Sequence, residues 1–345
     1  MDNIPVILLN WNGFDDTVEC VNSVLNQCYQ NFTIYLADNG SDNHEFEKLN
    51  DIFAANPKIK MIPFSTNLGF TAAHNRLFEI VGETGAEYVA LINNDAVADK
   101  RWLEDALNTA RNKQADMVAC MMLDYYNHSI VDSAGLFLLS SGEILPTGHG
   151  LPENKLPKII NPVAACGGAC LYRLSMLKET GFFDPYFSTG YEDAELGFRA
   201  FLMGKKIILA RDSIVFHKMS RSVSKVFNRQ KAQKIQEDIN YTWLKLMPAG
   251  LILLNALVNI PRTVFILLIH LFSFRFRFLS IYLNAIIRTF TKDLKIVATG
   301  RKSFRGKRKR SIREILKIQH CWLSYDINRF YRYIIRKEKN RFEKY

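Results

Sequence analysis

Short apolar runs alternate with amphipathic segments through the first two thirds of the chain. The runs are five or six residues long, as buried strands are, and the segments between them repeat apolar residues at helical spacing. We predict strands at 4–9, 32–37, 60–64, 88–92 and 117–122, and helices at 15–27, 44–55, 71–81 and 100–112. Because alternating strands and helices form βαβ units, this pattern predicts an α/β fold with a mainly parallel sheet flanked by helices.

The pattern becomes less regular after residue 122. A β-hairpin is expected within 135–150, with turns at Ser141-Gly142 and at Gly148. The segment 163–172 is apolar and centred on glycines, so its backbone must approach another part of the protein closely. Further helices are predicted at 174–179, which Gly181 would cap, and at 192–203, and further strands at 206–210 and 214–217.

The last third of the chain differs in kind. A polar helix is predicted at 225–246, followed by a strongly apolar stretch at 248–290. Pro261 and Arg262 interrupt this stretch, and its longest uncharged part, 263–274, has 12 residues against the ~20 that cross a bilayer. We therefore predict a pair of interfacial helices that dip into one leaflet. A buried helical domain and a single span that contains Arg262 are the alternatives.

The excess positive charge lies at one end of the chain. The net charge of +11 comes from 45 Lys+Arg and 34 Asp+Glu, and the segment 301–345 holds 16 of the former and 4 of the latter. That segment therefore carries +12, and the first 300 residues carry −1. A basic segment beside an apolar one predicts binding to an anionic membrane surface. The alternatives are a solvated tail and nonspecific binding of nucleic acid.

Composition limits the class of protein further. Hydrophobic residues make up 48% of the 345 positions, which is enough for a sizeable core and argues against global disorder. The six cysteines form no pair of metal-binding C-x-x-C motifs, so we expect free thiols in a reducing cytosol. The N-terminus leads almost at once into a strand, and we expect no signal peptide.

Polar side chains follow three of the predicted strands. Asn10 and Asn12 follow the first strand, Asp38 follows the second, and Asn93-Asn94-Asp95 follows the strand at 88–92. Ligands bind outside the carboxyl ends of strands in an open parallel sheet, so these residues are expected to share a site. One carboxylate beside two amides suits a hard cation that keeps waters and carries a substrate diphosphate. Ordinary turn chemistry is the alternative explanation of these asparagines.

Eight motifs in a fixed order carry a resemblance to a known family. They are Asn10-Trp11-Asn12-Gly13, Asp38-Asn39-Gly40-Ser41-Asp42, Asn67-Leu68-Gly69-Phe70 with Asn75, Asn93-Asn94-Asp95, Gly168-Ala169, Gly181-Phe182-Phe183-Asp184-Pro185-Tyr186-Phe187, Tyr191-Glu192-Asp193 and His217. The chain resembles family 2 glycosyltransferases of the GT-A fold, and is most similar to the rhamnosyltransferase-like branch that acts on lipid-linked glycans at the bacterial membrane. The resemblance covers about 4–222 and is looser beyond.

The resemblance implies a nucleotide-sugar donor, a dTDP- or UDP-sugar. Asp38 would accept a hydrogen bond from the imide N–H of thymine or uracil, with Asn10 and Asn12 framing the same pocket. The second loop that contacts the nucleotide would contain three further residues. These are Asn67, Phe70 and Asn75.

The resemblance also implies a divalent metal, Mg²⁺ or Mn²⁺. Asn93-Asn94-Asp95 occupies the position of the D-x-D motif of the family, in which the last Asp binds the metal. Asn93 replaces the first carboxylate, which predicts weaker metal binding and more water ligands. Asn93 and Asn94 would contact the donor, and Asp95 and His217 would hold the metal.

Asp193 is the candidate general base for inverting transfer, because a carboxylate must take the proton of the acceptor hydroxyl. Glu192 would orient the acceptor or the base, although both acids also suit a helix start. We expect Arg199 to pair with a nearby carboxylate. Lys218 or Arg221 would lie near the diphosphate.

These expectations define a protein with three regions. Residues 1–98 would bind the donor, 99–222 would bind the acceptor and carry out catalysis, and 223–345 would associate with the membrane. The expected activity is transfer of a sugar, L-rhamnose from dTDP-rhamnose, to a polyprenyl-diphosphate-linked or polysaccharide acceptor at the cytoplasmic face of the membrane, with no specific nucleic acid. A noncatalytic sugar-nucleotide-binding scaffold and a nucleic-acid-binding protein are the alternatives.

Overall fold

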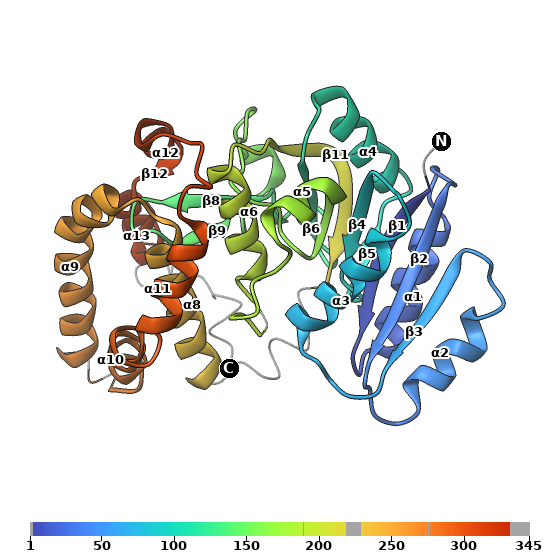
Figure 1. The fold of residues 1–345 in the computed structure, drawn as a ribbon, viewed down its shortest axis with the longest axis horizontal. Helices are drawn as coiled ribbons and strands as arrows, with labels where there is room; N and C mark the ends of the chain where they lie inside the picture. The colour runs from blue at the N-terminus through green and yellow to red at the C-terminus, as the bar shows by residue number, and fades with distance from the viewer. Residues whose placement is uncertain (1–2, 189, 219–228, 273, 275, 332–345) are drawn as a thin grey trace. The chain divides into compact units, whose positions relative to one another are not determined.

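The computed structural model describes residues 3–188, 190–218, 229–272, 274 and 276–331 (Figure 1). The chain divides into two compact units. The first unit contains Met1–Leu136 and Pro146–Met219, and the second contains Phe137–Leu145 and Ser220–Tyr345. The predicted boundary at residues 222 and 223 lies outside the described residues, and the predicted division at residue 98 stays a prediction.

Among the described residues, nine strands form one mixed sheet in the first unit, in the order β3-β2-β1-β4-β10-β6-β11-β5, with β7 paired to β6. The strands are β1 (Ile4–Asn10), β2 (Phe32–Asn39), β3 (Ile59–Phe64), β4 (Tyr88–Ile92), β5 (Ala96–Ala98), β6 (Met117–Asp124), β7 (Val131–Ser133), β10 (Ala169–Arg173) and β11 (Ile207–His217). Strands β1 to β4 are parallel, and β10 lies antiparallel between β4 and β6. The β2, β1 and β4 strands therefore end side by side at one edge.

Helices cover both faces of this sheet (Figure 1). On one face lie α1 (Phe14–Leu25), α2 (Glu45–Phe53) and α4 (Trp102–Lys113), and on the other lie α3 (Phe70–Gly82), α5 (Leu174–Thr180) and α6 (Glu192–Leu202). Alternate residues of β1 show the reason, since Val6 and Leu8 pack into one core and Ile7 into the other. The predicted α/β fold with a mainly parallel sheet is confirmed.

Four elements of this unit differ from the prediction. Strands β5 and β7 were not predicted, because three residues carry too little periodicity to be recognised. The two strands expected at 206–210 and 214–217 are one strand, β11, whose register against β6 shifts between Ala210 and Ile214. A 3₁₀ turn, η1 (Glu153–Lys155), adds to the loop before β10.

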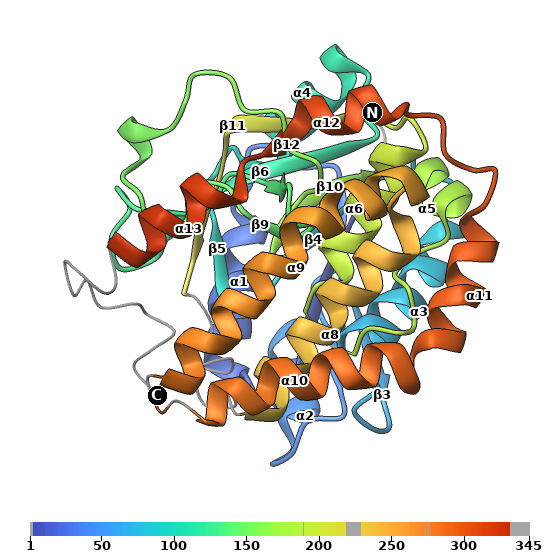
Figure 2. The same ribbon diagram turned by 90° about the vertical axis from the view of Figure 1, so that its left-hand side faces the viewer.

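The second unit is mainly helical, as predicted. Its elements are α8 (Arg229–Leu246), α9 (Ala249–Phe272), α10 (Phe276–Thr291), α11 (Leu294–Phe304), α12 (Ile312–Ile318), α13 (Trp322–Phe330) and a sheet of β8 (Leu136–Leu139), β9 (Ile144–Pro146) and β12 (Gln319–His320). Helix α10 contacts α8, α9 and α11 (Figure 2). The predicted hairpin is present, and it belongs to this unit.

Helix α9 corrects one prediction about the apolar stretch. The predicted interruption at Pro261 is wrong, because α9 continues through this residue to Phe272. The proline costs about 3 kcal/mol in lost hydrogen bonding and ring crowding, which packing of α9 against α10 offsets. Within the described residues, one segment, Ala249–Leu268, has the length and composition to cross a membrane, with a mean hydropathy of 2.0 and 11% of an 18-residue stretch within it buried.

Candidate active site

A continuous chain of hydrogen bonds joins the ends of β2, β1 and β4. Asn10 lies opposite Asp38 in the sheet, and its Nδ2 donates to Asp38 Oδ1 at 2.8 Å. Thr17 Oγ1, on α1, donates to Asn10 Oδ1 at 2.7 Å, and Asn94 Nδ2 donates to Thr17 Oγ1 at 3.0 Å. The network therefore fixes the amides of Asn10 and Asn94 relative to the buried Asp38 carboxylate.

The turn after β2 completes the surroundings of Asp38. The Ser41 amide donates to Asp38 Oδ2 at 3.0 Å, and Ser41 Oγ donates to Asp38 Oδ1 at 2.6 Å. Glu45, the first residue of α2, accepts hydrogen bonds from Asn10 Nδ2 and from the Gly13 amide. A carboxylate oxygen has two acceptor positions, so Oδ2 keeps capacity for a further donor such as a base N–H. The role of Asp38 in base recognition stays a prediction that this geometry permits.

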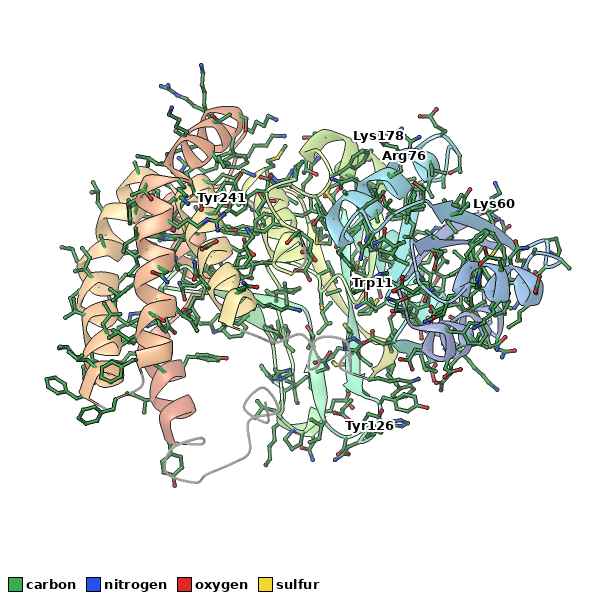
Figure 3. All side chains as sticks on the ribbon, turned by 90° about the horizontal axis from the view of Figure 1, so that it is seen from below. Trp11, Lys60, Arg76, Tyr126, Lys178 and Tyr241 are labelled. Carbon is green, nitrogen blue, oxygen red and sulfur yellow. The ribbon has the colours of Figure 1, made fainter. Side chains whose placement is uncertain are left out.

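Asn12 holds the loop after β1 against the loop after β2. Its backbone is left-handed, with φ of 51°, and its side chain exchanges hydrogen bonds with Asp42, whose amide donates to Asn12 Oδ1 at 2.8 Å. The adjacent Trp11 side chain, labelled in Figure 3, is 48% exposed at this loop. An exposed indole beside a polar pocket offers a surface on which a planar base can stack.

In the second loop predicted to contact the nucleotide, each of the three named residues makes a different contact within the protein. Asn67 Oδ1 accepts hydrogen bonds from Asn39 Nδ2 at 3.0 Å and from the Gly69 amide at 2.8 Å, so it joins this loop to the end of β2. The Asn75 amide is bonded on both sides to the backbone of Phe183, at 2.8 and 2.9 Å. Asn75 thus braces the segment after α5, and donor contact by its amide stays a prediction.

Phe70 begins α3 within an aromatic cluster. Its ring lies 4.0 Å from that of His74 and 6.3 Å from that of Phe183, centroid to centroid. Burial lowers the pKa of His74 to about 4, although the imidazole also bonds to the Phe70 carbonyl. His74 is therefore neutral at pH 7 and forms part of the aromatic core beside Phe70 and Phe183.

Two consecutive glycines connect the end of β4 with the candidate base. The Asn93 amide donates to the Gly168 carbonyl at 2.9 Å, and the Gly167 amide donates to Asp193 Oδ2 at 2.7 Å. A Cβ at Gly168 would lie 2.6 Å from the Met122 side chain, and one at Gly167 would lie 3.3 Å from the Asp193 Cβ. The close approach predicted for this segment is confirmed, since a side chain at Gly168 or Gly167 would require the Met122 or Asp193 side chain to move.

Asp193 lies in the first turn of α6, directly after Glu192. Burial raises the pKa of Asp193 above its ordinary value, against hydrogen bonds from the Gly167 and Ala194 amides that favour the charged form. Glu192 is itself buried. The turn before them holds Tyr191 at a φ of 74°, a strained conformation for an aromatic residue, which orients the start of α6.

His217, at the end of β11, lies between two carboxylates. Its Nε2 is 3.1 Å from Asp95 Oδ1, and its Nδ1 is 2.8 Å from Asp132 Oδ2 on β7. Burial opposes the charged imidazolium, but Asp95 and Asp132 outweigh it and raise the pKa of His217 to about 10. The hydrogen bonds from His149 and His217 hold the pKa of Asp132 well below its usual range despite burial. The predicted pair of Asp95 and His217 is brought together.

The Asp95–His217 pair fits a divalent cation as two of its ligands. Neighbouring ligands of an octahedral Mg²⁺ or Mn²⁺ lie about 3 Å apart, and Asp95 Oδ1 and His217 Nε2 are 3.1 Å apart. Asp132 would then occupy the second nitrogen of the imidazole, as carboxylates beside metal-binding histidines do. Within the described residues no group of three or more His, Cys, Asp or Glu could hold a metal, so water and substrate oxygens would complete its coordination.

The comparison with known families decides the classification. The sequence profile described as Glycosyl transferase family 2 matches residues 6–181, half of the chain. The chain belongs to glycosyl transferase family 2. It is therefore assigned to the glycosyltransferases. The matched range includes the ends of β1, β2 and β4, whereas Asp193 and His217 lie beyond it.

Individual relatives of this family 2 chain are distant. It is 23% identical over 222 residues to the glycosyltransferase GlyG of Streptococcus pneumoniae serotype 4. The aligned region covers 62% of this chain and 70% of GlyG. The crystal structure of GalNAc-T7 with UDP, GalNAc and Mn²⁺ superposes with a TM-score of 0.55 at 16% identity, and covers 71% of this chain and 50% of that one.

A third similar protein is the mannosyltransferase PcManGT from Pyrobaculum calidifontis, solved in complex with GDP-Man and Mn²⁺. Its TM-score is 0.52 at 14% identity, over 87% of this chain and 79% of that one. At these identities the structures show the fold alone. The predicted GT-A fold is confirmed, with a mixed, mostly parallel sheet and a C-terminal helical region.

The structure of this family 2 chain also places at the site five residues to which the sequence assigned no role, although Trp11 and Ser41 lie within two of the quoted motifs. They are Trp11, Thr17, Ser41, Glu45 and Asp132. Thr17 and Glu45 lie in the first turns of the helices that follow β1 and β2, which is a usable signal. Asp132 lies on a three-residue strand, and nothing in the sequence marks it.

Two basic residues predicted near the diphosphate have different outcomes. Lys218 Nζ bonds to Asp16 and Glu19 on α1, each at 2.5 Å, while its amide donates to the Asp95 carbonyl at 2.9 Å. Contact of Lys218 with a diphosphate stays a prediction. Arg221 lies outside the described residues. Arg199 pairs with the buried Glu195 at 2.8 Å, as predicted.

Proposed function

We propose that this glycosyltransferase inverts the anomeric centre, with Asp193 as general base and a divalent cation at Asp95 and His217. The observation that carries the proposal is the Gly167–Gly168 segment. The Gly167 amide donates to the Asp193 carboxylate at 2.7 Å, and the Gly168 carbonyl accepts from the Asn93 amide at the end of β4 at 2.9 Å. Such a rigid link supports a fixed distance between the groups that act on the acceptor and on the leaving group.

In the proposed reaction, the proton transfer and the displacement at the anomeric carbon occur in one step. Asp193 takes the proton of the acceptor hydroxyl while the hydroxyl oxygen forms a bond to the anomeric carbon. At the same time the bond from that carbon to the diphosphate oxygen breaks. The raised pKa of Asp193 makes it a better proton acceptor than an ordinary aspartate. Glu192 would orient the acceptor. The metal, when bound, would neutralise the charge of the departing diphosphate.

The donor pocket is proposed at the ends of β1 and β2. Asp38 would accept the imide N–H of thymine or uracil, and Asn10, Asn12, Asn67, Phe70, Asn75, Asn93 and Asn94 would line the donor site. We place dTDP-L-rhamnose first among donors because of the motif resemblance. The named neighbours contain UDP in one case and GDP-Man in the other, so the fold alone does not select the base.

The proposed acceptor is a polyprenyl-linked or polysaccharide glycan at the cytoplasmic face of the membrane. The exposed apolar face of α9 and the basic segment that begins at Arg301 support peripheral attachment there. The polar face of α9 supports it too, since Asn259 bonds to the Ser141 carbonyl and Arg262 pairs with Glu143 and Asp326 in the same unit. These pairs would be lost in a span surrounded by lipid.

A donor screen tests the function. The full chain, with Mn²⁺, is incubated with an acceptor glycolipid extract and with dTDP-L-rhamnose, UDP-hexoses or GDP-mannose, and free nucleoside diphosphate is measured. Asp193→Asn is expected to lower turnover by about 10²- to 10⁴-fold and to leave donor binding intact, whereas the exposed control Asp212→Asn changes neither. Transfer that survives in Asp193→Asn would refute the assigned base, and binding without transfer in the unmodified chain would favour a noncatalytic scaffold.

A further inference from the structure

The second unit contains a cavity of about 600 Å³ whose lining is strongly basic. It lies where α8 ends, α9 begins and α11 continues into the following turn. Its cationic residues are Lys245, Arg301, Lys302, Arg305 and Arg308, and its lining contains no Asp or Glu. A concave surface with five positive charges and no carboxylate is complementary to a multiply charged anion.

Three of the five cationic residues of this cavity have no ion-pair partner within the described part of the second unit. Among residues 229–272, 274 and 276–331, none forms an ion pair with Lys302, Arg305 or Arg308. Arg301 is held by two carbonyls at the end of α8, those of Leu244 and Met247, at 2.6 and 2.8 Å. Burial and the charge of Arg308 lower the pKa of Arg301, as expected where like charges face one another.

Two further features make the cavity a defined site. Lys245 is 6% exposed, and its Nζ lies 5.4 Å from the ring of Tyr241, which is labelled among the helices of this unit in Figure 3. Pro248 and Ala249 at the start of the 24-residue helix α9 also line the cavity. The free amides and the dipole of a helix start add to the attraction for an anion.

The surface that leads away from the cavity is apolar. Along α9, Leu253 is 72% exposed, Leu257 is 74% exposed and Phe265 is 64% exposed. Near the start of the same helix, the Ile312 side chain lies 3.7 Å from where a Cβ at Gly250 would be, and Ile312 is 41% exposed. A ligand that suits this arrangement has a phosphate group at one end and a hydrocarbon chain at the other.

We propose that the cavity binds the phosphate or diphosphate headgroup of a membrane lipid, with the hydrocarbon chain along the exposed face of α9. This inference deepens the membrane attachment proposed above and is independent of the donor chemistry. A free nucleic acid would satisfy the charges but would leave the apolar face uncovered. The lipid source is a bulk anionic phospholipid or a polyprenyl phosphate carrier, which share the same headgroup chemistry.

The test uses the full chain and sedimentation with three kinds of vesicle, without any sugar donor. The vesicles contain phosphatidylcholine alone, phosphatidylcholine with phosphatidylglycerol, or phosphatidylcholine with a polyprenyl diphosphate. The cavity variant is Lys302→Gln with Arg308→Gln, and the matched control is Lys309→Gln with Arg313→Gln. Each removes one lysine and one arginine at exposed positions, but only the first pair lines the cavity.

For vesicles that contain phosphatidylglycerol or the polyprenyl diphosphate, the cavity variant is expected to lose at least ten times more affinity than the control. The lipid for which this difference is seen is the lipid whose headgroup the cavity binds. Millimolar pyrophosphate is expected to compete with binding by the unmodified chain and not with the residual binding by the cavity variant. Equal losses in the two variants would overturn the proposal, because a diffuse basic surface loses affinity with each charge wherever it lies.

A second arm distinguishes the competing partner and the transferase itself. If the cavity variant loses affinity for duplex DNA and keeps it for vesicles, the lipid proposal is wrong. Release of nucleoside diphosphate in the presence of a soluble acceptor is expected to be unchanged in the cavity variant. Equal losses of vesicle affinity in the cavity variant and in the control, with normal release, would therefore overturn the lipid site alone, and absent release in every variant would overturn the proposed reaction alone.

Discussion

At the scale of single residues, Asp132 has the most testable role. Its carboxylate lies 2.8 Å from His217 Nδ1 and so directs Nε2 toward Asp95. Asp132→Asn is expected to lower the affinity for Mn²⁺ about 10- to 100-fold, because the imidazole loses the carboxylate that orients it. Calorimetry or Mn²⁺ electron paramagnetic resonance measures this without turnover. An unchanged affinity in Asp132→Asn, with the fold intact by circular dichroism, would remove His217 from the proposed metal site.

Asn93 and Asp95 carry opposite predictions. Asp95→Ala should abolish metal-dependent release of nucleoside diphosphate, since it removes one of the two proposed protein ligands. Asn93→Asp should be tolerated, because the structure fixes Asn93 through its backbone, with the amide bonded to the Gly168 carbonyl and the carbonyl accepting from Cys20 Sγ at 3.3 Å. Both variants are compared in a titration with Mn²⁺. An inactive Asn93→Asp would show that the Asn93 amide contacts the donor.

The sequence predicts site residues where they follow a strand and fails where tertiary contacts place them. Asn10, Asp38 and Asp95 could be named because strand ends in a parallel sheet converge at one edge. Asp132 could not, since a three-residue strand carries no periodic signal and only its pairing with β6 brings it to His217. The engagement of Asn75 by Phe183, 108 positions away, is equally invisible in the sequence.

At the scale of elements, Arg199 joins α6 to the end of α5. Its guanidinium pairs with Glu195, which is 0% exposed, and donates to the carbonyls of Thr180, Gly181 and Phe182. Arg199→Met should reduce the free energy of unfolding by about 3–5 kcal/mol, because the Glu195 charge stays buried without the guanidinium. Urea denaturation measures the loss. The double variant with Glu195→Gln should lose less than Arg199→Met alone, and an equal loss would locate the effect in the carbonyl contacts.

The stability of the α3 layer should depend on pH through His74. Its folded pKa of about 4 lies below the ordinary value of 6.5, so the unfolded chain binds more protons between these values. Stability is then complete above pH 6.5 and falls as pH drops toward 4, by about 2 kcal/mol between pH 7 and pH 5. His74→Phe should reduce this loss in urea titrations at the two pH values. His44→Gln, at a side chain that is 87% exposed, is the control that should not.

The pattern of apolar residues along the chain is sufficient to predict the bounds of some helices and strands but not of others. Long segments with a clear period, such as α1 and α3, were predicted within a few residues. The sequence predicts an interruption at Pro261, which is wrong, because packing of α9 against α10 stabilises the helix across the proline and no local pattern contains that packing. Strand β11 appeared as two strands because the register shift near Ala210 interrupts the alternation while pairing with β6 continues.

At the scale of the whole molecule, two units divide the chemistry. The match to the family lies within 6–181, and every residue of the candidate active site lies in the first unit. The excess positive charge lies in the second. The sequence revealed this asymmetry, whereas the assignment of Phe137–Leu145 to the second unit depends on pairing of β8 with β12, about 180 residues away, which no local pattern contains.

The arrangement of α9 predicts attachment to a membrane surface without crossing it. The outward face carries Leu257 and Phe265, whereas Asn255 is buried and Arg262 is paired within the unit. Transfer of each large apolar side chain into lipid contributes about 1.5–3 kcal/mol, so Leu257→Ser with Phe265→Ser should weaken binding to all three kinds of vesicle by at least tenfold. Ile52→Ser, at a side chain that is 51% exposed on α2, is the matched control.

Alkaline carbonate extraction of native membranes separates the two modes of attachment. A protein held by one face of α9 and by basic residues should be released at high pH, since no segment is surrounded by lipid. A spanning α9 would resist extraction, and it would require Arg262 to leave Glu143 and Asp326 and enter the hydrocarbon, at a cost of about 2.5–3.5 kcal/mol for the charge alone. Retention of the unmodified chain in the extracted membrane would therefore overturn the peripheral assignment, even if Leu257→Ser with Phe265→Ser weakens vesicle binding as expected.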